Sequence, residues 1–398
     1  MRPHLQAPVP RAPCAVVVLA ALLLTACATP HPGLPPSRSP APRSPAHSLS
    51  TASVPAEAEP RSLPLTALRG WEAEDHAAAL AAFRETCGAT RDPALARACR
   101  NARAVGPLVE EQAERYFEAN FRAEPLAGSG VLTAYFAPEY PARRGPDDVF
   151  SAPVRPKPSD LKIIDAGLFD SAQAGRPGAA RGTGDSPLAP YPDRAAIEAT
   201  PAERPLAWMR PEDLFFLQIQ GSGVLTFEDG TRMKALYAAN NGRAFVGIAN
   251  ALRDQGLLAR DNTSGEAIRA WLAAHRGAQA QAIMRLNPRY AFFSLAPDDG
   301  RQPVGSANLP LPPGRALAMD PAYHQSGELY WIDAGAPILQ GAFPTYRRLA
   351  IALDTGGAIR GDIRADLYLG LGAEAGAEAG RVRHTLRLYR LVPKDASL

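Results

Sequence analysis

Residues 352–370, near the C-terminus, read ALDTGGAIRGDIRADLYLG. This segment holds three carboxylates, Asp354, Asp362 and Asp366, separated by glycines that permit sharp turns and by β-forming residues typical of short strands. Read alone, three acids in a glycine-rich turn are most simply explained as a solvated surface. An acid whose direction is fixed by a strand could instead carry proton chemistry, and the surrounding sequence decides between these interpretations.

The C-terminal region around this segment is dense in predicted strands and short turns. The run that ends at Asp320 predicts a loop followed by a strand, and further strands are predicted at residues 328–332, 349–353 and 384–391. This density is expected of a small barrel. The glycine pattern of residues 370–376 misses the dinucleotide-binding fingerprint by one residue and lacks a βαβ context, which excludes nucleotide binding.

The predicted secondary structure changes several times along the chain before this region. Residues 66–123 place apolar side chains at helical spacing, and the β-rich run at residues 130–140 indicates a strand that leaves one unit and enters another. Residues 145–205 predict long loops over few strands. Residues 287–293 return to β character, which indicates re-entry into the first unit.

Residues 213–227 predict a pair of strands joined by a tight turn. Apolar and glutamine side chains alternate up to Gln220, and residues 221–223 read GSG. Glutamine at position 220 excludes the nucleophile elbow, which requires glycine there. Two helices are predicted next, at residues 240–256 and from Thr263, which begins a capping box.

The N-terminus has the features of an export signal. It carries Arg2 and Arg11 and no acid before the apolar run at residues 15–26. This run is too short to span the ~30 Å hydrocarbon core of a bilayer. Residues 24–27 read LTAC, which resembles the lipobox of bacterial lipoproteins and implies cleavage before Cys27 and lipidation of that residue. The alternative is an ordinary secreted protein with a cysteine at its cleavage site.

The composition of the remaining chain is typical of a globular protein on a membrane anchor. Residues 27–64 are rich in proline and poor in bulky apolar side chains, so we expect a disordered tether. The 398 residues are 46% hydrophobic, enough for one large domain or two. The formal net charge of +3 and the lack of a basic stripe interleaved with aromatic residues exclude a nucleic-acid partner.

The cysteines and histidines predict no metal site. Cys87 and Cys99 are the two cysteines after Cys27, and an exported protein meets an oxidising compartment. A disulfide between them is therefore favoured over two free thiols. Two cysteines without neighbouring histidines cannot form a structural zinc site, and the seven histidines are scattered.

Several motifs in order resemble the membrane-bound lytic murein transglycosylase A family, lipoproteins with a domain named for three aspartates. The motifs lie at residues 130–138, 218–223, 237–242, 287–293, 310–320 and 352–380. The resemblance implies a mainly β fold with helical additions, in which a double-psi β-barrel and a smaller inserted β-domain enclose a groove for a glycan strand. It assigns residues 1–26 to the signal peptide, 27–64 to the lipidated tether, 65–133 with 291–398 to the barrel, and 134–290 to the insert.

The resemblance also implies roles for individual residues. The catalytic acid falls on Asp366, with Asp354 as its electrostatic neighbour and Asp320 as a support of the barrel. The loop before Asp366 varies in length within the family and here adds Asp362. We prefer Asp366 because a strand fixes its direction. The candidate sugar contacts are Thr133, Tyr135, Gln220, Ser222, Tyr237 and Asn241, although the two tyrosines are equally compatible with core positions.

The implied reaction cleaves the β-1,4 bond between N-acetylmuramic acid and N-acetylglucosamine. A neutral Asp366 protonates the leaving oxygen, and its carboxylate then accepts the proton of the muramic acid C6 hydroxyl as this hydroxyl attacks C1. The product is a 1,6-anhydro end, and no metal or cofactor is required. The alternatives are a lipoprotein that only binds peptidoglycan and an ordinary glycan hydrolase.

The resemblance to a lipobox implies a location, and the resemblance to the family implies a substrate. Ala28, a small neutral residue after the lipidated cysteine, is typical of lipoproteins sent to the outer membrane. We therefore expect a protein held by its lipid on the periplasmic side of that membrane, with peptidoglycan glycan strands as its substrate. Association with the cell-wall synthesis machinery is an open expectation.

Overall fold

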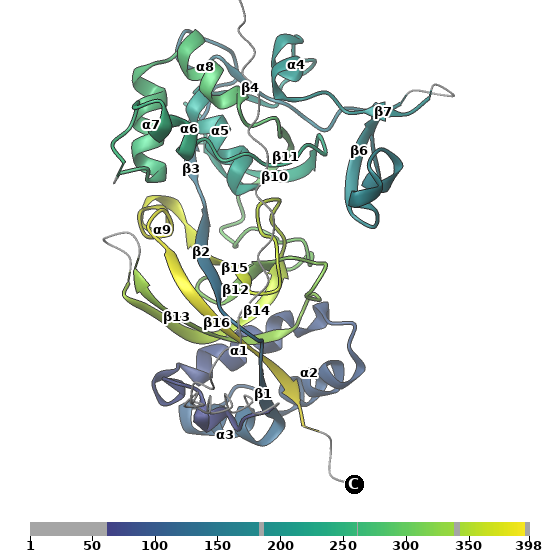
Figure 1. The fold of residues 1–398 in the computed structure, drawn as a ribbon, viewed down its shortest axis with the longest axis vertical. Helices are drawn as coiled ribbons and strands as arrows, with labels where there is room; N and C mark the ends of the chain where they lie inside the picture. Colours follow the sequence, from purple (N-terminus) through teal and green to yellow (C-terminus); the bar gives the residue numbers. More distant parts are fainter. Residues whose placement is uncertain (1–61, 183–186, 261, 338–342, 395–398) are drawn as a thin grey trace, which may run out of the picture. The chain divides into compact units, whose positions relative to one another are not determined.

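The computed structural model describes residues 62–182, 187–260, 262–337 and 343–394. All of them belong to one unit, Ala58–Leu398, whose elements are labelled in Figure 1. The predicted signal peptide, Cys27 and the predicted tether up to residue 61 lie outside the described residues. Within the described residues, no helix is both long enough and apolar enough to cross a bilayer.

Three α-helices precede the first strand. They are α1 His76–Thr86, α2 Pro93–Val105 and α3 Glu110–Asn120, accompanied by the short 3-10 helices η1 Leu65–Ala67, η2 Trp71–Ala73 and η3 Cys87–Ala89. Asp75 caps α1 because its carboxylate accepts a hydrogen bond from Ala78 N at 2.9 Å. Phe83 of α1 and Phe117 of α3 are fully buried in the core that these helices share with the barrel. The helical character predicted for residues 66–123 is confirmed up to Asn120, whereas residues 121–123 belong to strand β1 Phe121–Pro125.

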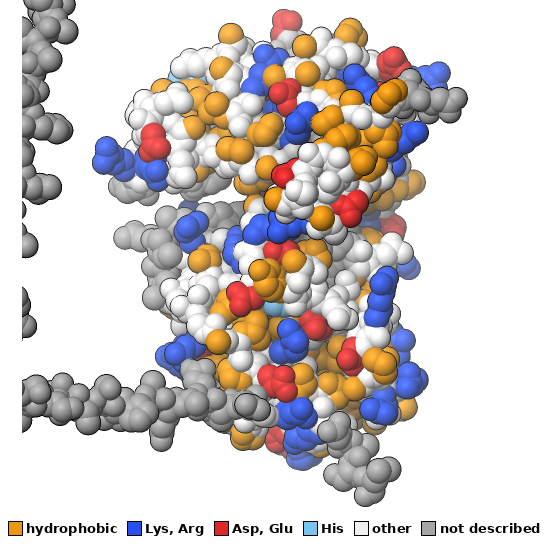
Figure 2. Space-filling model, turned by 45° about the vertical axis from the view of Figure 1, so that its right-hand side comes forward, with side chains coloured by type: hydrophobic (Ala, Val, Ile, Leu, Met, Phe, Trp, Pro, Cys, Tyr) orange, Lys and Arg blue, Asp and Glu red, His pale blue; other side chains and the backbone are white. Residues whose placement is uncertain are grey.

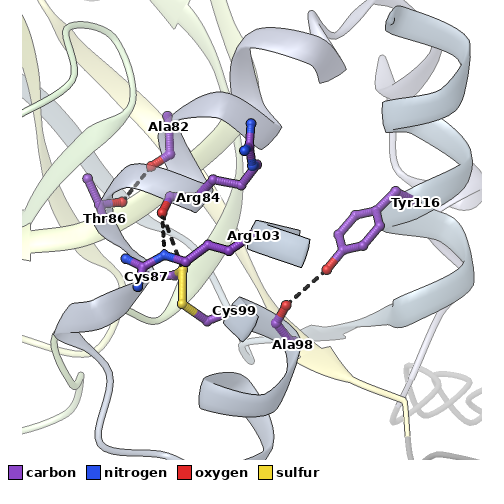
Figure 3. The surroundings of a disulfide bond; sticks show 8 residues. All are labelled: Ala82, Arg84, Thr86, Cys87, Ala98, Cys99, Arg103 and Tyr116. Atoms are coloured by element: carbon purple, nitrogen blue, oxygen red, sulfur yellow. Dashed lines mark hydrogen bonds between the residues drawn. A yellow bond between two sulfur atoms is a disulfide. The ribbon is translucent and has the colours of Figure 1, made fainter. Parts of the chain in front are cut away.

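The predicted disulfide joins the end of α1 to α2. Cys87 and Cys99 are bonded, twelve positions apart in the chain, and Figure 3 shows the bond between the two helical segments. Close by, the hydroxyl of Tyr116 in α3 donates to the carbonyl oxygen of Ala98 in α2 at 3.0 Å. The bond and this contact link all three helices.

A closed β-barrel forms the centre of the fold. One sheet has the order β1-β16-β13-β14-β12-β15-β2, and a further pairing between β16 and β2 closes it. The pairs β12/β14 and β15/β2 are parallel, and α9 packs against β2. The mainly β fold with a barrel is confirmed. The bounds are β1 Phe121–Pro125, β2 Gly130–Ala137, β12 Ala316–Met319, β13 Leu329–Pro337, β14 Thr345–Asp354, β15 Arg364–Leu371, α9 Gly372–Ala379 and β16 Arg383–Pro393.

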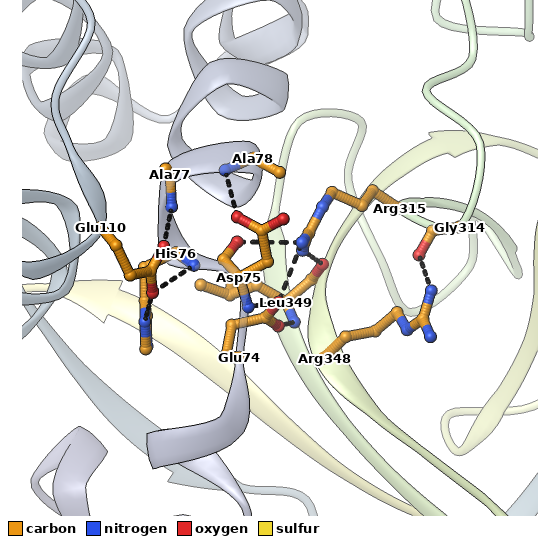
Figure 4. A network of polar contacts seen from close by, with 10 residues as sticks. All are labelled: Glu74, Asp75, His76, Ala77, Ala78, Glu110, Gly314, Arg315, Arg348 and Leu349. Carbon is orange, nitrogen blue, oxygen red and sulfur yellow. Dashed lines mark hydrogen bonds and ion pairs between the residues drawn. The ribbon is translucent and has the colours of Figure 1, made fainter.

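A buried carboxylate joins the helices to the barrel. Glu74, just before α1, accepts hydrogen bonds from Arg315 Nη2 at 2.9 Å and from Leu349 N of β14. Figure 4 shows these contacts converging from the helical segment and from the barrel. Because Glu74 is 8% exposed and fully paired, it fixes the helices against β14.

A second β region occupies the middle of the chain. Its main sheet has the order β11-β10-β9-β3, beside two small sheets, β4-β8 and β5-β6-β7, and several helices. The strands are β3 Glu139–Pro141, β4 Ala152–Val154, β5 Leu161–Asp165, β6 Pro177–Arg181, β7 Ala189–Pro190, β8 Ala207–Met209, β9 Gly223–Thr226, β10 Arg232–Asn240 and β11 Ala291–Pro297. The helices are η4 Ala166–Leu168, η5 Ser171–Gln173, α4 Arg194–Ala199, α5 Pro211–Gln220, α6 Ala249–Asp254, α7 Gly265–Ala274 and α8 Ala278–Arg285. The predicted domain limits at residues 134 and 290 stay a prediction.

The predicted strand pair at residues 213–227 is wrong in its first half, which is helix α5. Pro211 occupies the first turn, where its fixed φ suits a helix, and Glu212 and Asp213 complement the positive end of the helix dipole. The helix ends at Gln220 and is followed by Gly221, which has a φ of 88°. Most of α5 is buried on several sides, so apolar and polar residues do not recur along it with the period of a helix.

Two other boundaries differ from the sequence predictions. Strand β10 runs to Asn240, and the helix predicted for residues 240–256 is limited to α6, whereas α7 is capped by Ser264 rather than Thr263. Strand β11 pairs with β10 along its whole length. The chain therefore returns to the barrel after Pro297, later than residues 287–293 suggest.

Charged side chains of both signs are interspersed with apolar ones on the face shown in Figure 2. This mixture agrees with the small formal net charge of +3. It gives this face no uniformly basic character.

Candidate active site

Strand register places the candidate acids in one row across the barrel. Ala318 of β12 pairs with Asp354 of β14 on one side and with Asp366 of β15 on the other, and Asp366 pairs with Thr133 of β2. A Cβ on Gly130 would come within 1.6 Å of the carbonyl oxygen of Ile363, so only glycine lets β2 begin beside β15 in this register. The small side chain of Ala318 separates the two acids.

A directional hydrogen-bond chain holds Asp366. Arg364 Nη2 donates to the hydroxyl oxygen of Thr133 at 2.9 Å, and this hydroxyl donates to Asp366 Oδ1. A guanidinium has no acceptor atom, so the Thr133 hydroxyl must accept from Arg364. Its single hydrogen is therefore donated to Asp366. Oδ1 is therefore an acceptor, and a proton carried by Asp366 belongs on Oδ2.

The surroundings of Asp366 raise its pKa above the ordinary value of 3.8. Burial is the largest cause, and the negative charge of Asp354 acts in the same direction. The hydrogen bond from Thr133 and the positive charge of Arg364 lower the pKa without cancelling the effect of burial. The site thus favours the neutral, proton-carrying form of this acid more than water does.

Asp354 is held by three donors. Its Oδ2 accepts from the hydroxyl of Tyr135 at 2.9 Å, and its Oδ1 accepts from the backbone N–H groups of Ser306 and Thr355, both at 2.9 Å. Burial raises the pKa of Asp354 more than these hydrogen bonds lower it. Burial and the charge of Asp354 raise the pKa of Tyr135 well above 10, so Tyr135 remains a neutral donor.

Asp320 has a structural environment. It is 2% exposed, and its carboxylate accepts from Gly361 N at 2.9 Å, from Ala322 N at 3.1 Å and from Arg360 at 3.4 Å. Burial alone would raise the pKa of Asp320, but these donors lower it below 3.8. Asp320 therefore anchors the turn at Gly361, in line with its predicted supporting role.

Asp362 lies in the same turn but faces solvent. Its side chain is exposed, and the group held by the fold is its backbone carbonyl oxygen, 2.8 Å from His324 Nε2. Its surroundings therefore resemble the solvated turn that the isolated segment suggests. This geometry favours Asp366 over Asp362 as the acid.

The predicted sugar contacts divide into groups. Thr133 and Tyr135 lie at the acids, and Gln220 borders β2 because its Oε1 accepts from Phe136 N at 3.2 Å. Tyr237 is 45% exposed, and Ser222 is partly exposed just beyond α5.

Asn241 is placed differently from the other candidates. It is 1% exposed, and its amide nitrogen donates to the carbonyl oxygens of Pro192 at 2.9 Å and Pro288 at 2.8 Å. Its side-chain oxygen accepts from Tyr290 N at 2.9 Å. These contacts assign Asn241 to holding a loop rather than to binding sugar.

Sequence reasoning missed two contributors to the site. Arg364 could have been found, because it precedes Asp366 by two positions and shares its strand face. Ser306 offered no signal, since it reaches Asp354 through its backbone N–H from a loop far away in the sequence. Among the residues that the structure describes, no group of His, Cys, Asp and Glu is arranged to hold a metal ion.

Two family models match the chain. The model described as the MltA specific insert domain matches residues 131–294, and the model described as the 3D domain matches residues 315–392. The second match contains Asp320, Asp354 and Asp366, and the first covers most of the second β region.

Named relatives agree with these models. The chain is 32% identical over 242 residues to membrane-bound lytic murein transglycosylase A of Vibrio cholerae, a match that spans 58% of this chain and only 57% of that protein. A crystal structure of membrane-bound lytic murein transglycosylase from Agrobacterium tumefaciens is 31% identical, with a TM-score of 0.71 over 83% of this chain and 97% of the other. MltA from Neisseria gonorrhoeae is 27% identical, with a TM-score of 0.69 over 84% and 93%. The chain belongs to the membrane-bound lytic murein transglycosylase A family.

Proposed function

We propose that this protein is a lytic transglycosylase. It cleaves the β-1,4 bond between N-acetylmuramic acid and N-acetylglucosamine in peptidoglycan and leaves 1,6-anhydromuramic acid ends. Its family membership and the names of its relatives support this reaction class. The observation that carries the proposal is Asp366, whose pKa is raised and whose Oδ1 is occupied by Thr133, so that Oδ2 carries the proton.

Asp366 acts first as an acid and then as a base. Its neutral carboxyl donates the Oδ2 proton to the glycosidic oxygen as the bond to C1 breaks and positive charge develops there. The resulting carboxylate accepts the proton of the muramic acid C6 hydroxyl, and the C6 oxygen bonds to C1. Asp366 ends the cycle protonated, and no water is consumed.

Asp354 supports this reaction from beside Asp366, because its negative charge raises the pKa of Asp366. Each of its oxygens already accepts at least one hydrogen bond, from Tyr135, Ser306 or Thr355, which makes it a poor nucleophile or base for water. A hydrolase requires a second carboxylate in one of those roles. The engagement of Asp354 therefore favours the single-aspartate route over hydrolysis.

The glycan strand is proposed to lie beside the barrel face that bears Asp366, between the barrel and the insert at residues 134–290. Thr133 and Tyr135 hold the acids there, and Gln220, Ser222 and Tyr237 supply polar contacts to the sugars. The N-terminal segment is proposed to hold this domain on the periplasmic side of the outer membrane through a lipid on Cys27.

The test is the mass of the products released from purified peptidoglycan. We expect wild-type protein to release muropeptides lighter by one water than their hydrolytic counterparts, with anhydro ends. Products with reducing ends would assign the protein to the hydrolases. Binding to peptidoglycan without release would assign it to the non-catalytic lipoproteins.

A further inference from the structure

The second β region contains a cavity of about 340 Å³ that shares no residue with the site around Asp366. Its walls come from β4, α4, α5, α8 and the segment that joins α7 to α8. Pockets of a few hundred cubic ångströms are typical of small-molecule sites. The charged and amide side chains that line this one are Arg155, Arg194, Glu198, Glu212, Arg276 and Gln281.

Backbone carbonyl oxygens hold two arginines in the wall of the cavity. Arg194 is 2% exposed and donates to the carbonyl oxygens of Asn287 at 2.9 Å and Arg289 at 2.6 Å. Arg155 donates through its Nη atoms to the carbonyl oxygens of Thr200 and Pro201, but its buried Nε has no partner among the described residues. Because this Nε is closed off from solvent, Arg155 contributes its positive charge to the cavity rather than a donor open to a ligand.

The acids in the wall are already paired. Glu212 accepts from Arg276 Nε at distances of 3.1 and 3.2 Å. Glu198 forms ion pairs with Arg194 at 3.3 Å and with Arg285 at 2.9 Å. Arg155 pairs with carbonyl oxygens and with no acid among the described ion pairs, so the wall keeps a positive charge in excess.

The amino end of α8 adds to this preference for an anion. Gly277 and Ala278, where α8 begins, line the cavity, and no side chain caps the helix. Free N–H groups at a helix N-terminus favour negative charge. Phe215, Met284 and Tyr290 supply the apolar part of the wall.

We propose that this cavity binds a carboxylate of the peptide attached to the glycan. The proposal rests on peptidoglycan being the substrate, because the peptides of peptidoglycan carry several carboxylates on short aliphatic stems. The positive charge in excess in the wall and the amino end of α8 both attract a carboxylate. The paired acids in the wall disfavour a doubly charged phosphate relative to a singly charged carboxylate.

The test measures peptide binding to a variant that is expected not to cleave peptidoglycan. The full-length protein with Asp366→Asn is titrated calorimetrically with the tripeptide L-alanyl-γ-D-glutamyl-meso-diaminopimelate. Gln281→Glu places a negative charge in the cavity wall on an exposed helix position, and we expect it to weaken binding about tenfold. Gln255→Glu makes the same change at an exposed position outside the wall and away from α8, and binding should stay within about twofold.

Three results would overturn the proposal. The tripeptide could fail to bind, both glutamate variants could weaken binding equally, or succinate could bind as tightly as the tripeptide, which would assign the cavity to free carboxylates. The assay reports binding without catalysis, whereas the mass of the peptidoglycan products reports catalysis. Failure of one proposal is therefore distinguishable from failure of the other.

Discussion

The barrel surrounds Asp320 and Asp366 in opposite ways, although the two acids lie on or beside neighbouring strands. Asp320 follows β12 and accepts from two backbone N–H groups and from Arg360, which lower its pKa. Asp366 lies within β15 and accepts from one hydroxyl, so burial prevails and its pKa is raised. Burial, which prevails at Asp366, and hydrogen-bond donors, which prevail at Asp320, therefore together separate an acid suited to proton transfer from one that supports the fold.

The largest effect is expected for Asp366→Asn. Removing the proton donor should lower kcat/KM on peptidoglycan about 1,000-fold. The thermal unfolding midpoint should stay unchanged or rise, because the raised pKa means that folding penalises the charged form of Asp366 at neutral pH. An activity within tenfold of wild type would remove Asp366 from its proposed role.

Asp320→Asn should act on stability instead. Losing the carboxylate that holds the turn at Gly361 should cost about 2 kcal/mol of unfolding free energy at pH 7, measured by urea denaturation. The folded-state pKa of Asp320 lies below its unfolded value. Its contribution is therefore present above the unfolded pKa and is lost as pH falls through the folded pKa.

We therefore expect the difference in unfolding free energy between Asp320→Asn and wild type to become smaller below pH 3.8. Activity per folded molecule should remain close to wild type. Equal stability of the two proteins at pH 7 would contradict the supporting role of Asp320.

Thr133→Val should have a smaller effect on catalysis, about tenfold in kcat/KM. The hydrogen bond from Thr133 lowers the pKa of Asp366, so its loss should raise that pKa further. Because Asp366 must start protonated, the basic limb of the pH profile should move to higher pH. Thr133→Ser keeps the hydroxyl and should restore both values, and a serine variant as impaired as the valine variant would refute the hydrogen-bond chain.

Asp362→Asn should have the smallest effect. Its exposed side chain takes no part in the row of acids, so kcat/KM and the unfolding midpoint should both match wild type within about twofold and about one degree. A loss of activity here, with Asp366→Asn active, would move the acid to Asp362.

The barrel strands were predictable because β-formers and turn residues alternate clearly between Asp320 and Leu391. Helix α5 was not, because burial on most sides removed the helical period on which sequence reasoning relies. The sequence likewise did not predict that β11 continues the second sheet, because its pairing with β10 is set by tertiary structure.

The candidate site was predictable only in part. The resemblance identified Asp366, Asp354, Thr133 and Tyr135, and the register places Thr133 and Asp366 side by side. The donors that set the pKa values could not be derived in the same way. Ser306 acts through a backbone N–H. Asn241, predicted to bind sugar, instead donates hydrogen bonds to backbone carbonyl oxygens, whose positions depend on the folded loops.

Titration of the aspartate side chains in one sample tests the central comparison most directly. Isotope labelling at aspartate Cγ allows the carboxyl resonances to be followed by NMR as pH changes, and Asp366→Asn and Asp320→Asn identify the two signals. We predict a midpoint above 3.8 for Asp366 and below 3.8 for Asp320. Midpoints in the reverse order, or an Asp366 midpoint at or below 3.8, would contradict the assignment of Asp366 as the proton carrier.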